Sequence, residues 1–275
     1  MSEVSWLRRV LTAVGIIMVL AAGLFFLPPF GYAAVVITFI GLGLYEFYSL
    51  IERKGIFIYK YIGITIGVLI PLSIFFRFEP TKGWELFFIT TSTLLFFILQ
   101  FIRKDSSQAI VGISTTLFGI FYVSWFLSFL IKIRFLPHGI SLVAFLLLVA
   151  KSGDMGAYLV GTAWGKNLLI TRISPKKTLE GAIGGLSASM LAAVLSIWYL
   201  PFIPAFHVVA LGALLGFLSQ VGDLCESLIK RDCGVKDSGN YFPGLGGVLD
   251  IIDSIIFASP IFYYYLLHFQ LIPGT

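Results

Sequence analysis

Long apolar runs, separated by short polar stretches, dominate this chain. Of its 275 residues, 58% are hydrophobic and 12% are charged, and an ordinary soluble domain carries about twice that charged fraction. A helix that crosses a bilayer needs about 20 mostly apolar residues, and many runs reach or approach that length. The sequence therefore predicts a polytopic integral membrane protein and argues against a soluble enzyme, a disordered chain or a coiled coil.

The apolar runs predict an all-α fold with about nine transmembrane helices, because a lipid-exposed backbone must satisfy its own polar groups. The predicted spans are 10–27, 32–50, 61–76, 84–102, 110–131, 139–150, 182–200, 206–221 and 248–267. The first run follows two arginines, as in a signal peptide, but no convincing cleavage site follows it, so a retained helix is expected. The helix at 139–150 can continue through the glycine-rich residues 151–165.

The basic residues indicate an orientation for these spans. With nine helices and the N-terminus inside, Lys and Arg concentrate in the cytoplasmic loops, as the positive-inside rule expects. The outside loops then hold only Arg77, Lys82, Lys132 and Arg134 of the 19 basic residues. We therefore expect a bacterial cytoplasmic (inner) membrane protein whose polar segments 151–181 and 222–247 face the cytoplasm. The net charge of +5 is attributed to loops beside anionic lipid and not to nucleic-acid binding.

Polar residues divide the chain into two unequal regions. Residues 1–138 are predicted to be transmembrane helices joined by short loops without recognisable chemistry. Residues 139–275 carry almost every unusual polar residue and are predicted to form a C-terminal catalytic region. Glu46, inside the second predicted span, is either an interior hydrogen-bonding residue or a residue on a substrate path.

The acids of the second polar segment are spaced for a metal site. Asp223 and Glu226 are three residues apart, so they would share one face of a helix, and Asp250 and Asp253 repeat that spacing. Carboxylates at the mouth of a membrane helix are costly unless a cation neutralises them, and Mg²⁺ prefers such hard oxygen ligands. The alternative is structural ion pairing. The candidate partners are Lys230, Arg231 and Lys236.

A glycine-rich loop directly precedes the last apolar run. Gly244, Gly246 and Gly247 permit close backbone approach, and the amides of a helix start attract anions. A phosphate held between these amides and a metal on Asp250 is one interpretation. A flexible connector is the other.

The first polar segment repeats the combination of glycine, acid and lysine. Ser-Pro at 174–175 predicts a turn into a helix that starts near Lys176, with Glu180 in its first turns. Lys166, Lys176 and Lys177 could clamp a polyphosphate or an anionic lipid headgroup. Simple contact of interfacial lysines with lipid phosphates is the alternative.

Taken together, these segments contain a series of spaced motifs. They read Ser152-Gly-Asp-Met-Gly-Ala-Tyr, Ser174-Pro-Lys-Lys-Thr-x-Glu-Gly, Ser227-Leu-Ile-Lys-Arg, Lys236-Asp-Ser-Gly, Pro243-Gly-x-Gly-Gly and Asp250-x-x-Asp-Ser. This series resembles the conserved blocks of phosphatidate cytidylyltransferases (CDP-diacylglycerol synthases) over most of residues 150–254. Two positions depart from that family's pattern: Leu245 replaces a histidine and Ile251 replaces an arginine. These departures are compatible with a divergent but active enzyme, an altered substrate preference or lost activity. The retained acids, lysines and glycines favour an active enzyme.

The resemblance implies a reaction in phospholipid biosynthesis, in which CTP and phosphatidic acid give CDP-diacylglycerol and pyrophosphate. A lipid phosphate oxygen would attack the α-phosphorus of CTP, so no activated serine or cysteine is needed. Catalysis would then come mainly from positioning and charge neutralisation. On this basis Asp223 and Asp250 would hold Mg²⁺, as one or two ions, with Asp253 or Asp237 as further ligands.

Basic and small residues complete the predicted site. Lys230, Arg231 and Lys236 would neutralise the triphosphate, and Asp237 is placed with them as a catalytic residue. Lys176 and Lys177 would lie near the lipid phosphate or the leaving pyrophosphate. The other residues expected to bind substrate are Asp154, Lys166, Ser227, Gly244, Gly246 and Gly247.

Two other functions are compatible with the same features. One is a related CTP-dependent polyprenol or lipid-alcohol transferase or kinase. The other is a membrane transporter, although transporters usually place their decisive polar groups near the bilayer midplane and here they gather at one face. The expected partners are CTP, phosphatidic acid and the lipid bilayer, with a homodimer left open and no nucleic acid.

Overall fold

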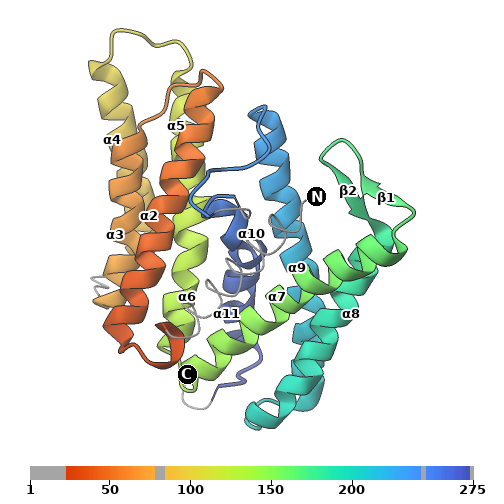
Figure 1. The fold of residues 1–275 in the computed structure, drawn as a ribbon. Helices are drawn as coiled ribbons and strands as arrows, with labels where there is room; N and C mark the ends of the chain where they lie inside the picture. The colour runs from red at the N-terminus through yellow and green to blue at the C-terminus, as the bar shows by residue number, and fades with distance from the viewer. Residues whose placement is uncertain (1–22, 78–83, 243–245, 273–275) are drawn as a thin grey trace.

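The structure, a computed structural model, describes residues 23–77, 84–242 and 246–272. Apart from its last residues, the predicted span 10–27 lies outside these ranges, and so does Gly244. The first half is a helical bundle (Figure 1). Its elements are α2 (Pro29–Arg53), α3 (Lys60–Phe75), α4 (Trp84–Ile102), α5 (Ala109–Gly119), the π-helix η1 (Ile120–Trp125) and α6 (Phe126–Arg134).

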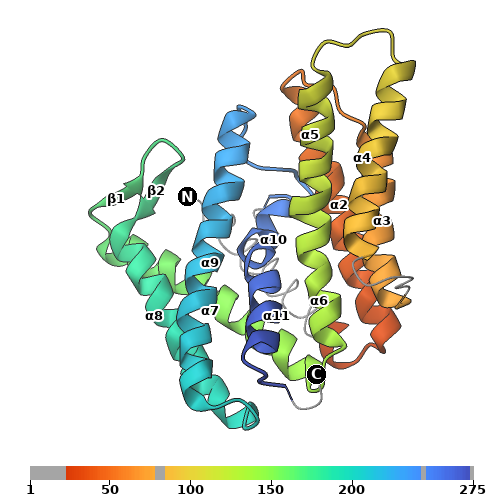
Figure 2. The same cartoon turned by 180° about the vertical axis from the view of Figure 1, so that it is seen from behind.

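The second half contains the remaining helices and a small hairpin. Its elements are α7 (Gly139–Trp164), β1 (Leu168–Ile170), β2 (Ser174–Thr178), α8 (Leu179–Ser196), the 3₁₀ turn η2 (Ile197–Tyr199), α9 (Ala205–Asp232), α10 (Leu249–Ile256) and α11 (Ala258–His268). In Figures 1 and 2, α10 and α11 lie between the first bundle and the α7–α9 group. The two halves therefore meet along α10 and α11.

Six helical stretches of the described residues are long and apolar enough to cross a membrane. They are Pro29–Arg53, Ala109–Arg134, Gly139–Trp164, Leu179–Tyr199, Ala205–Asp232 and Leu249–His268. Two shorter apolar helices, Lys60–Phe75 and Phe87–Ile102, accompany them. Each predicted span from 32–50 onward coincides with an apolar helix, but the total of about nine is not confirmed. The protein is an integral membrane protein, since so many apolar helices of this length need lipid around them.

The fold is mostly helical, as predicted, and one small hairpin departs from the all-α prediction. β1 and β2 pair antiparallel, with Leu168 opposite Thr178 and Ile170 opposite Ser174. Lys176 lies in β2, so the helix expected to begin there begins at Leu179 instead. The reason is that Thr178 is the better helix cap: its Oγ1 accepts a hydrogen bond from the Gly181 N–H at 3.1 Å. The lysines before it are consequently extended.

The predicted continuation of the sixth span is confirmed, because α7 is one helix from Gly139 to Trp164. Small residues let α7 and α8 approach closely, as is common between membrane helices. A Cβ on Gly156 would lie 2.9 Å from the carbonyl oxygen of Gly184. Ser189 of α8 also donates a hydrogen bond to the Val149 carbonyl at 3.0 Å. This packing fixes the polar end of α7 beside the hairpin and α8.

Four polar connections lie at the same end of the molecule in both views (Figures 1 and 2). They are 54–59, 103–108, 165–178 and the described residues 233–242 and 246–248. Contacts join them: Lys54 forms an ion pair with Asp232 at 2.5 Å, and Arg231 Nε donates to the Ile173 carbonyl at 3.1 Å. This is the end predicted to face the cytoplasm, and that orientation remains a prediction.

Candidate active site

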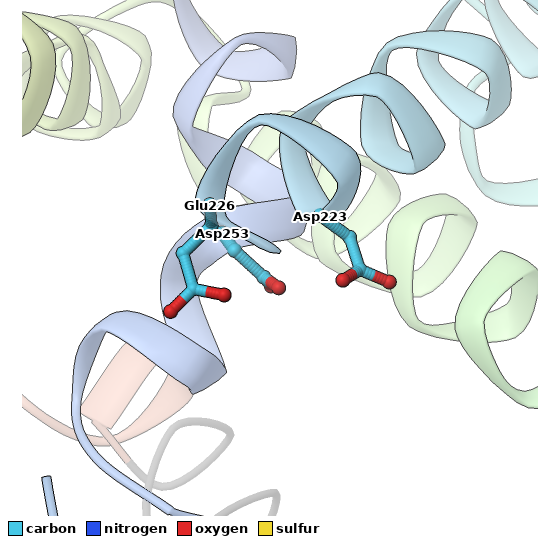
Figure 3. A group of neighbouring side chains, drawn as sticks. All are labelled: Asp223, Glu226 and Asp253. Carbon is cyan, nitrogen blue, oxygen red and sulfur yellow. The ribbon is translucent and has the colours of Figure 1, made fainter. Parts of the chain in front are cut away.

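Three carboxylates converge where α9 meets α10. Asp223 and Glu226 come from α9 and Asp253 from α10, and one oxygen of each lies within 4.8 Å of the others (Figure 3). Glu226 and Asp253 are buried, with 2% and 7% exposure, and Asp223 is half-buried. Gly222 permits this approach, since a Cβ there would collide with the Asp253 carbonyl oxygen. These three residues are called the acid trio below.

The acid trio is incompletely neutralised by its neighbours. Lys177 pairs with Asp223 at 2.5 Å, and Lys230 forms an ion pair with Glu226. The Asp253 Oδ1 accepts the Ser254 N–H at 2.6 Å. The buried Glu226 Oε1 accepts no hydrogen bond from any residue that the structure describes. Buried polar atoms normally have partners, so three close carboxylates with an orphaned oxygen fit a divalent cation with oxygen preference.

Lys151 joins the polar end of α7 to α10. Its Nζ donates to the Ile251 carbonyl at 2.9 Å, to the Ser254 Oγ at 2.7 Å and to Asp154 Oδ2 at 3.1 Å. It thus brings a positive charge close to Asp253 and ties α7 to α10, the helix that carries this acid. The sequence interpretation counted Lys151 only among the cytoplasmic charges.

Asp250, predicted as a magnesium ligand, lies outside the acid trio. Its Oδ1 contacts Lys230 Nζ at 2.5 Å. Its Oδ2 accepts from the Ser238 N–H at 3.0 Å, the Ser238 hydroxyl at 2.8 Å and the Gly247 N–H at 2.7 Å. Lys230 therefore bridges Glu226 and Asp250. The ion-pair alternative describes the Asp250–Lys230 contact, while metal binding by Asp250 remains a prediction.

A cavity of about 370 Å³ opens beside Asp223, between α7, α8, α9 and the hairpin. Its volume falls within the range of small-molecule sites. Acidic, basic and amide side chains line one part of it: Asp154, Lys176, Lys177, Gln220 and Asp223. The cavity thus brings both hairpin lysines to the same place as one member of the acid trio.

The other predicted residues lie on α9 and on the neighbouring loops. Ser227 is buried, and its hydroxyl lies 3.5 Å from Asp223. Lys166 is exposed, and its N–H donates to Glu180 at 3.0 Å. Arg231 binds backbone carbonyls of Ile173 and Val235. Neither the cavity lining nor the acid trio includes Lys166, Arg231, Lys236 or Asp237.

The amides at the start of α10 already have protein acceptors. The Gly247 N–H donates to Asp250, and the N–H groups of Val248 and Leu249 each donate to Glu46 at 2.9 Å. Gly246 has a φ of +96°, which favours glycine. The N–H groups of residues 247–249 are therefore not free to bind a phosphate, as one interpretation of the glycine-rich loop requires.

Glu46 is thus an interior hydrogen-bonding residue, the first of its two alternatives. Glu226 was singled out for its spacing with Asp223 but was not placed in the predicted metal site. The sequence feature that could have identified Glu226 is its helical spacing. It lies on the buried face of α9 together with Ser219, Gly222 and Lys230. Lys151 had a signal too, as a basic residue directly before the glycine-and-acid motif at 152–158.

The sequence matches the cytidylyltransferase family over residues 7–269. It is 33% identical to a phosphatidate cytidylyltransferase of Synechocystis sp., over 94% of this chain and 96% of that protein. It is 39% identical to the Bacillus subtilis phosphatidate cytidylyltransferase, over 54% of this chain and 56% of that one. A Brucella suis phosphatidate cytidylyltransferase is 42% identical over 46% and 47%, respectively. The resemblance seen in the motifs is confirmed, and the chain belongs to the cytidylyltransferase family.

Proposed function

We propose that this protein is a phosphatidate cytidylyltransferase, which converts CTP and phosphatidic acid to CDP-diacylglycerol and pyrophosphate in phospholipid biosynthesis. The observation that carries the proposal is the acid trio beside a lysine-lined cavity, at the polar end of a bundle of membrane helices. The named activity of the relatives supports it, above all that of the Synechocystis protein, which aligns over almost its whole length.

The reaction joins two anions, so the site must supply positive charge. A phosphate oxygen of phosphatidic acid forms a bond to the α-phosphorus of CTP, and the bond from that phosphorus to the β-phosphate oxygen breaks. Pyrophosphate leaves with the bonding electron pair, and CDP-diacylglycerol remains. No protein nucleophile is required, because a phosphate oxygen of the lipid is itself the nucleophile.

We assign a divalent cation, Mg²⁺ as one ion or two, to the acid trio of Asp223, Glu226 and Asp253. Such an ion, when bound, would neutralise phosphate oxygens and orient them for in-line attack. This assignment keeps two of the predicted ligands, replaces Asp250 by Glu226 as the nearest third ligand, and leaves Asp250 to hold Lys230. Removal of Lys230 would then disturb two carboxylates at once, because it contacts both Glu226 and Asp250.

Lys176 and Lys177 would receive the phosphates of the substrates. Both line the cavity, and Lys177 already contacts Asp223 at 2.5 Å. A lysine is a compact charge on a flexible stem, so Lys177 can exchange its carboxylate partner for a phosphate when a cation occupies the acid trio. Asp154, which pairs with Lys151, would form part of the cavity wall.

The position of the site suits a water-soluble and a lipid substrate. We propose that the polar end of the bundle faces the cytoplasm of a bacterial cell, at the inner membrane, where CTP arrives from water and phosphatidic acid from the adjacent leaflet. A homodimer is compatible with this placement, and chemical cross-linking in native membranes tests it.

The direct test uses purified protein in lipid–detergent micelles with α-³²P-labelled CTP, Mg²⁺ and phosphatidic acid. The expected products are a labelled CDP-lipid and unlabelled pyrophosphate. Replacing phosphatidic acid with polyprenol tests the kinase alternative, which would release labelled CDP instead. Labelled solute flux in proteoliposomes, without CDP-lipid formation, would support a transporter and overturn the proposal.

A further inference from the structure

The most connected buried charge of the N-terminal bundle is Glu46 of α2. It is 3% exposed and lies more than 190 residues away in sequence from the groups that it binds. Its Oε1 accepts the Val248 N–H at 2.9 Å, and its Oε2 accepts the Leu249 N–H at 2.9 Å and the Ser238 hydroxyl at 3.0 Å. Burying a lone carboxylate is costly, and here three donors compensate for that cost.

The surrounding backbone is shaped around this carboxylate. Gly239 and Gly247 lie against it, and a Cβ on either would collide with the Glu46 side chain. The donors at 248 and 249 belong to the start of α10, where the helix dipole favours a negative charge. Glu46 therefore serves as a helix cap that comes from another helix.

The cap connects directly to the candidate active site. Ser238 bridges the two carboxylates, with its hydroxyl 3.0 Å from Glu46 Oε2 and 2.8 Å from Asp250 Oδ2. Asp250 in turn holds Lys230, which pairs with Glu226 of the acid trio. One turn along α10 from Asp250 lies Asp253, another member of that trio.

We propose that Glu46 is a positioning residue, whose carboxylate fixes Ser238 and the start of α10 so that Asp250 and Asp253 meet the residues of α9. It touches no residue of the acid trio itself and acts through Ser238, Val248 and Leu249. The catalytic consequence rests on the proposed function, whereas the effect on α10 does not. The first bundle thereby contributes one specific group to the geometry of the site.

Glu46→Gln is the primary test, because it keeps the side-chain length but replaces one acceptor oxygen with a donor. Three donors would then converge on one remaining oxygen. Glu52→Gln is the matched control: it removes the same charge from the same helix, where Glu52 is exposed and pairs with Lys60. Both variants are compared with wild type by size-exclusion chromatography and thermal unfolding, so that folding is established first.

Two measurements on folded protein do not depend on turnover. Hydrogen exchange of the peptide covering 246–256 is expected to accelerate in Glu46→Gln and not in Glu52→Gln. Mn²⁺ binding, followed by its electron spin resonance signal, is expected to weaken about tenfold or more, as for residues that orient metal ligands. With CTP and phosphatidic acid, kcat should fall while the KM for phosphatidic acid stays within about twofold of wild type, because Glu46 lies away from the cavity lining.

Ser238→Ala keeps the inference testable if Glu46→Gln does not fold. It removes the hydroxyl between the two carboxylates but leaves both amide donors to Glu46, so it should shift exchange and Mn²⁺ binding in the same direction by less. In the double variant, the loss of Mn²⁺ affinity should be smaller than the product of the losses in the two single variants. The reason is that both substitutions disrupt the same connection between Glu46 and Asp250. Unchanged exchange and Mn²⁺ binding in folded Glu46→Gln, or in Ser238→Ala where the former is unfolded, would overturn the inference. If the wild-type protein formed no CDP-lipid, while Glu46→Gln still accelerated hydrogen exchange at 246–256, only the proposed function would be refuted.

Discussion

The N-terminal bundle and the C-terminal helices both bury hydroxyls that bond to backbone carbonyls, but the C-terminal helices also gather buried charges into one group. In the bundle, buried hydroxyls bond to backbone carbonyls: Tyr48 donates to Thr116 at 2.8 Å, and Thr116 to Gly112 at 2.7 Å. The charged exceptions there are Glu46 and Lys60. In the C-terminal helices, Glu226, Lys230 and Asp253 are all buried or nearly so, within one group of contacts.

This difference shows what each region contributes. Hydroxyl-to-carbonyl bonds satisfy polar atoms at low cost and stabilise a fixed bundle. Buried charges cost free energy unless well paired, and in membrane proteins they mark functional sites. Because the buried charges gather in the C-terminal helices, the proposed site lies there, and the N-terminal bundle packs against it. Glu46 is the buried residue of the bundle that contacts the start of α10, beside the proposed site.

The largest expected effect is loss of an acid-trio ligand. Asp253→Asn should lower kcat by about a thousandfold or more, because one of three anionic ligands for the cation becomes neutral. Asp105→Asn, an exposed acid on the loop between α4 and α5, is the matched control and should leave kcat unchanged. The measurement is CDP-lipid formation over a Mg²⁺ titration.

Asp250→Asn sharpens this experiment. It should lower kcat less than Asp253→Asn does, because Asp250 holds Lys230 and lies outside the acid trio. A greater loss of Mg²⁺ dependence in Asp250→Asn would restore the prediction made from the sequence. Full Mg²⁺-dependent turnover in Asp253→Asn would contradict the cation assignment.

The next effect concerns the cavity lysines. Lys177→Ala should reduce kcat/KM by about 10- to 100-fold, equivalent to about 1.4–2.8 kcal/mol, because a phosphate partner is lost and Asp223 loses its cation. Lys104→Ala removes an exposed lysine of the loop between α4 and α5, which has no role in the proposed site, and is expected to change kcat/KM by less than about twofold. Initial rates over a CTP concentration series distinguish them. Equal losses in the two variants would mean that the cavity does not bind the phosphates.

The close approach of α9 and α10 at the acid trio can be tested through stability. Gly222→Ala should lower the free energy of unfolding by about 1–3 kcal/mol, because its Cβ meets the Asp253 carbonyl and α9 and α10 must separate. Gly41→Ala in α2 should be close to neutral, since its Cβ would lie 3.6 Å from Val68, an ordinary contact. Thermal unfolding in detergent measures both. A stable, fully active Gly222→Ala protein would show that α9 and α10 need not approach so closely.

The helices and the site were predictable to different extents. Apolar length gave the helices from 32 onward, because lipid imposes a helix on such runs. It did not resolve the hairpin, where Thr178 and not Ser174 caps the helix. The number of spans was not settled by the same criterion, since α3, with 16 residues, is shorter than a full crossing.

The sequence predicted the types of residue in the site better than it predicted which of them contact one another. Spacing placed Asp223 and Glu226 on one face of a helix, and the structure brings both to Asp253. Spacing could not separate Asp250 from Asp253, since both lie on α10. Their different partners depend on how α10 packs against α9 and on the backbone at Ser238 and Gly247. Nor could it connect Glu46 with Val248, because that contact depends on how the two halves pack.

The smallest expected effect is at the surface where the two regions also touch. Lys54, after α2, pairs with Asp232 at the end of α9 at 2.5 Å, with 36% and 63% of the side chains exposed. Water and salt weaken such a pair, so its coupling energy should be at most about 0.2–1 kcal/mol. A double-mutant cycle of Lys54→Ala and Asp232→Ala, read by thermal unfolding at low and high salt, measures it. A coupling well above that range would mean that the regions are joined at the surface as firmly as through the buried Glu46, and the contrast between them would weaken accordingly.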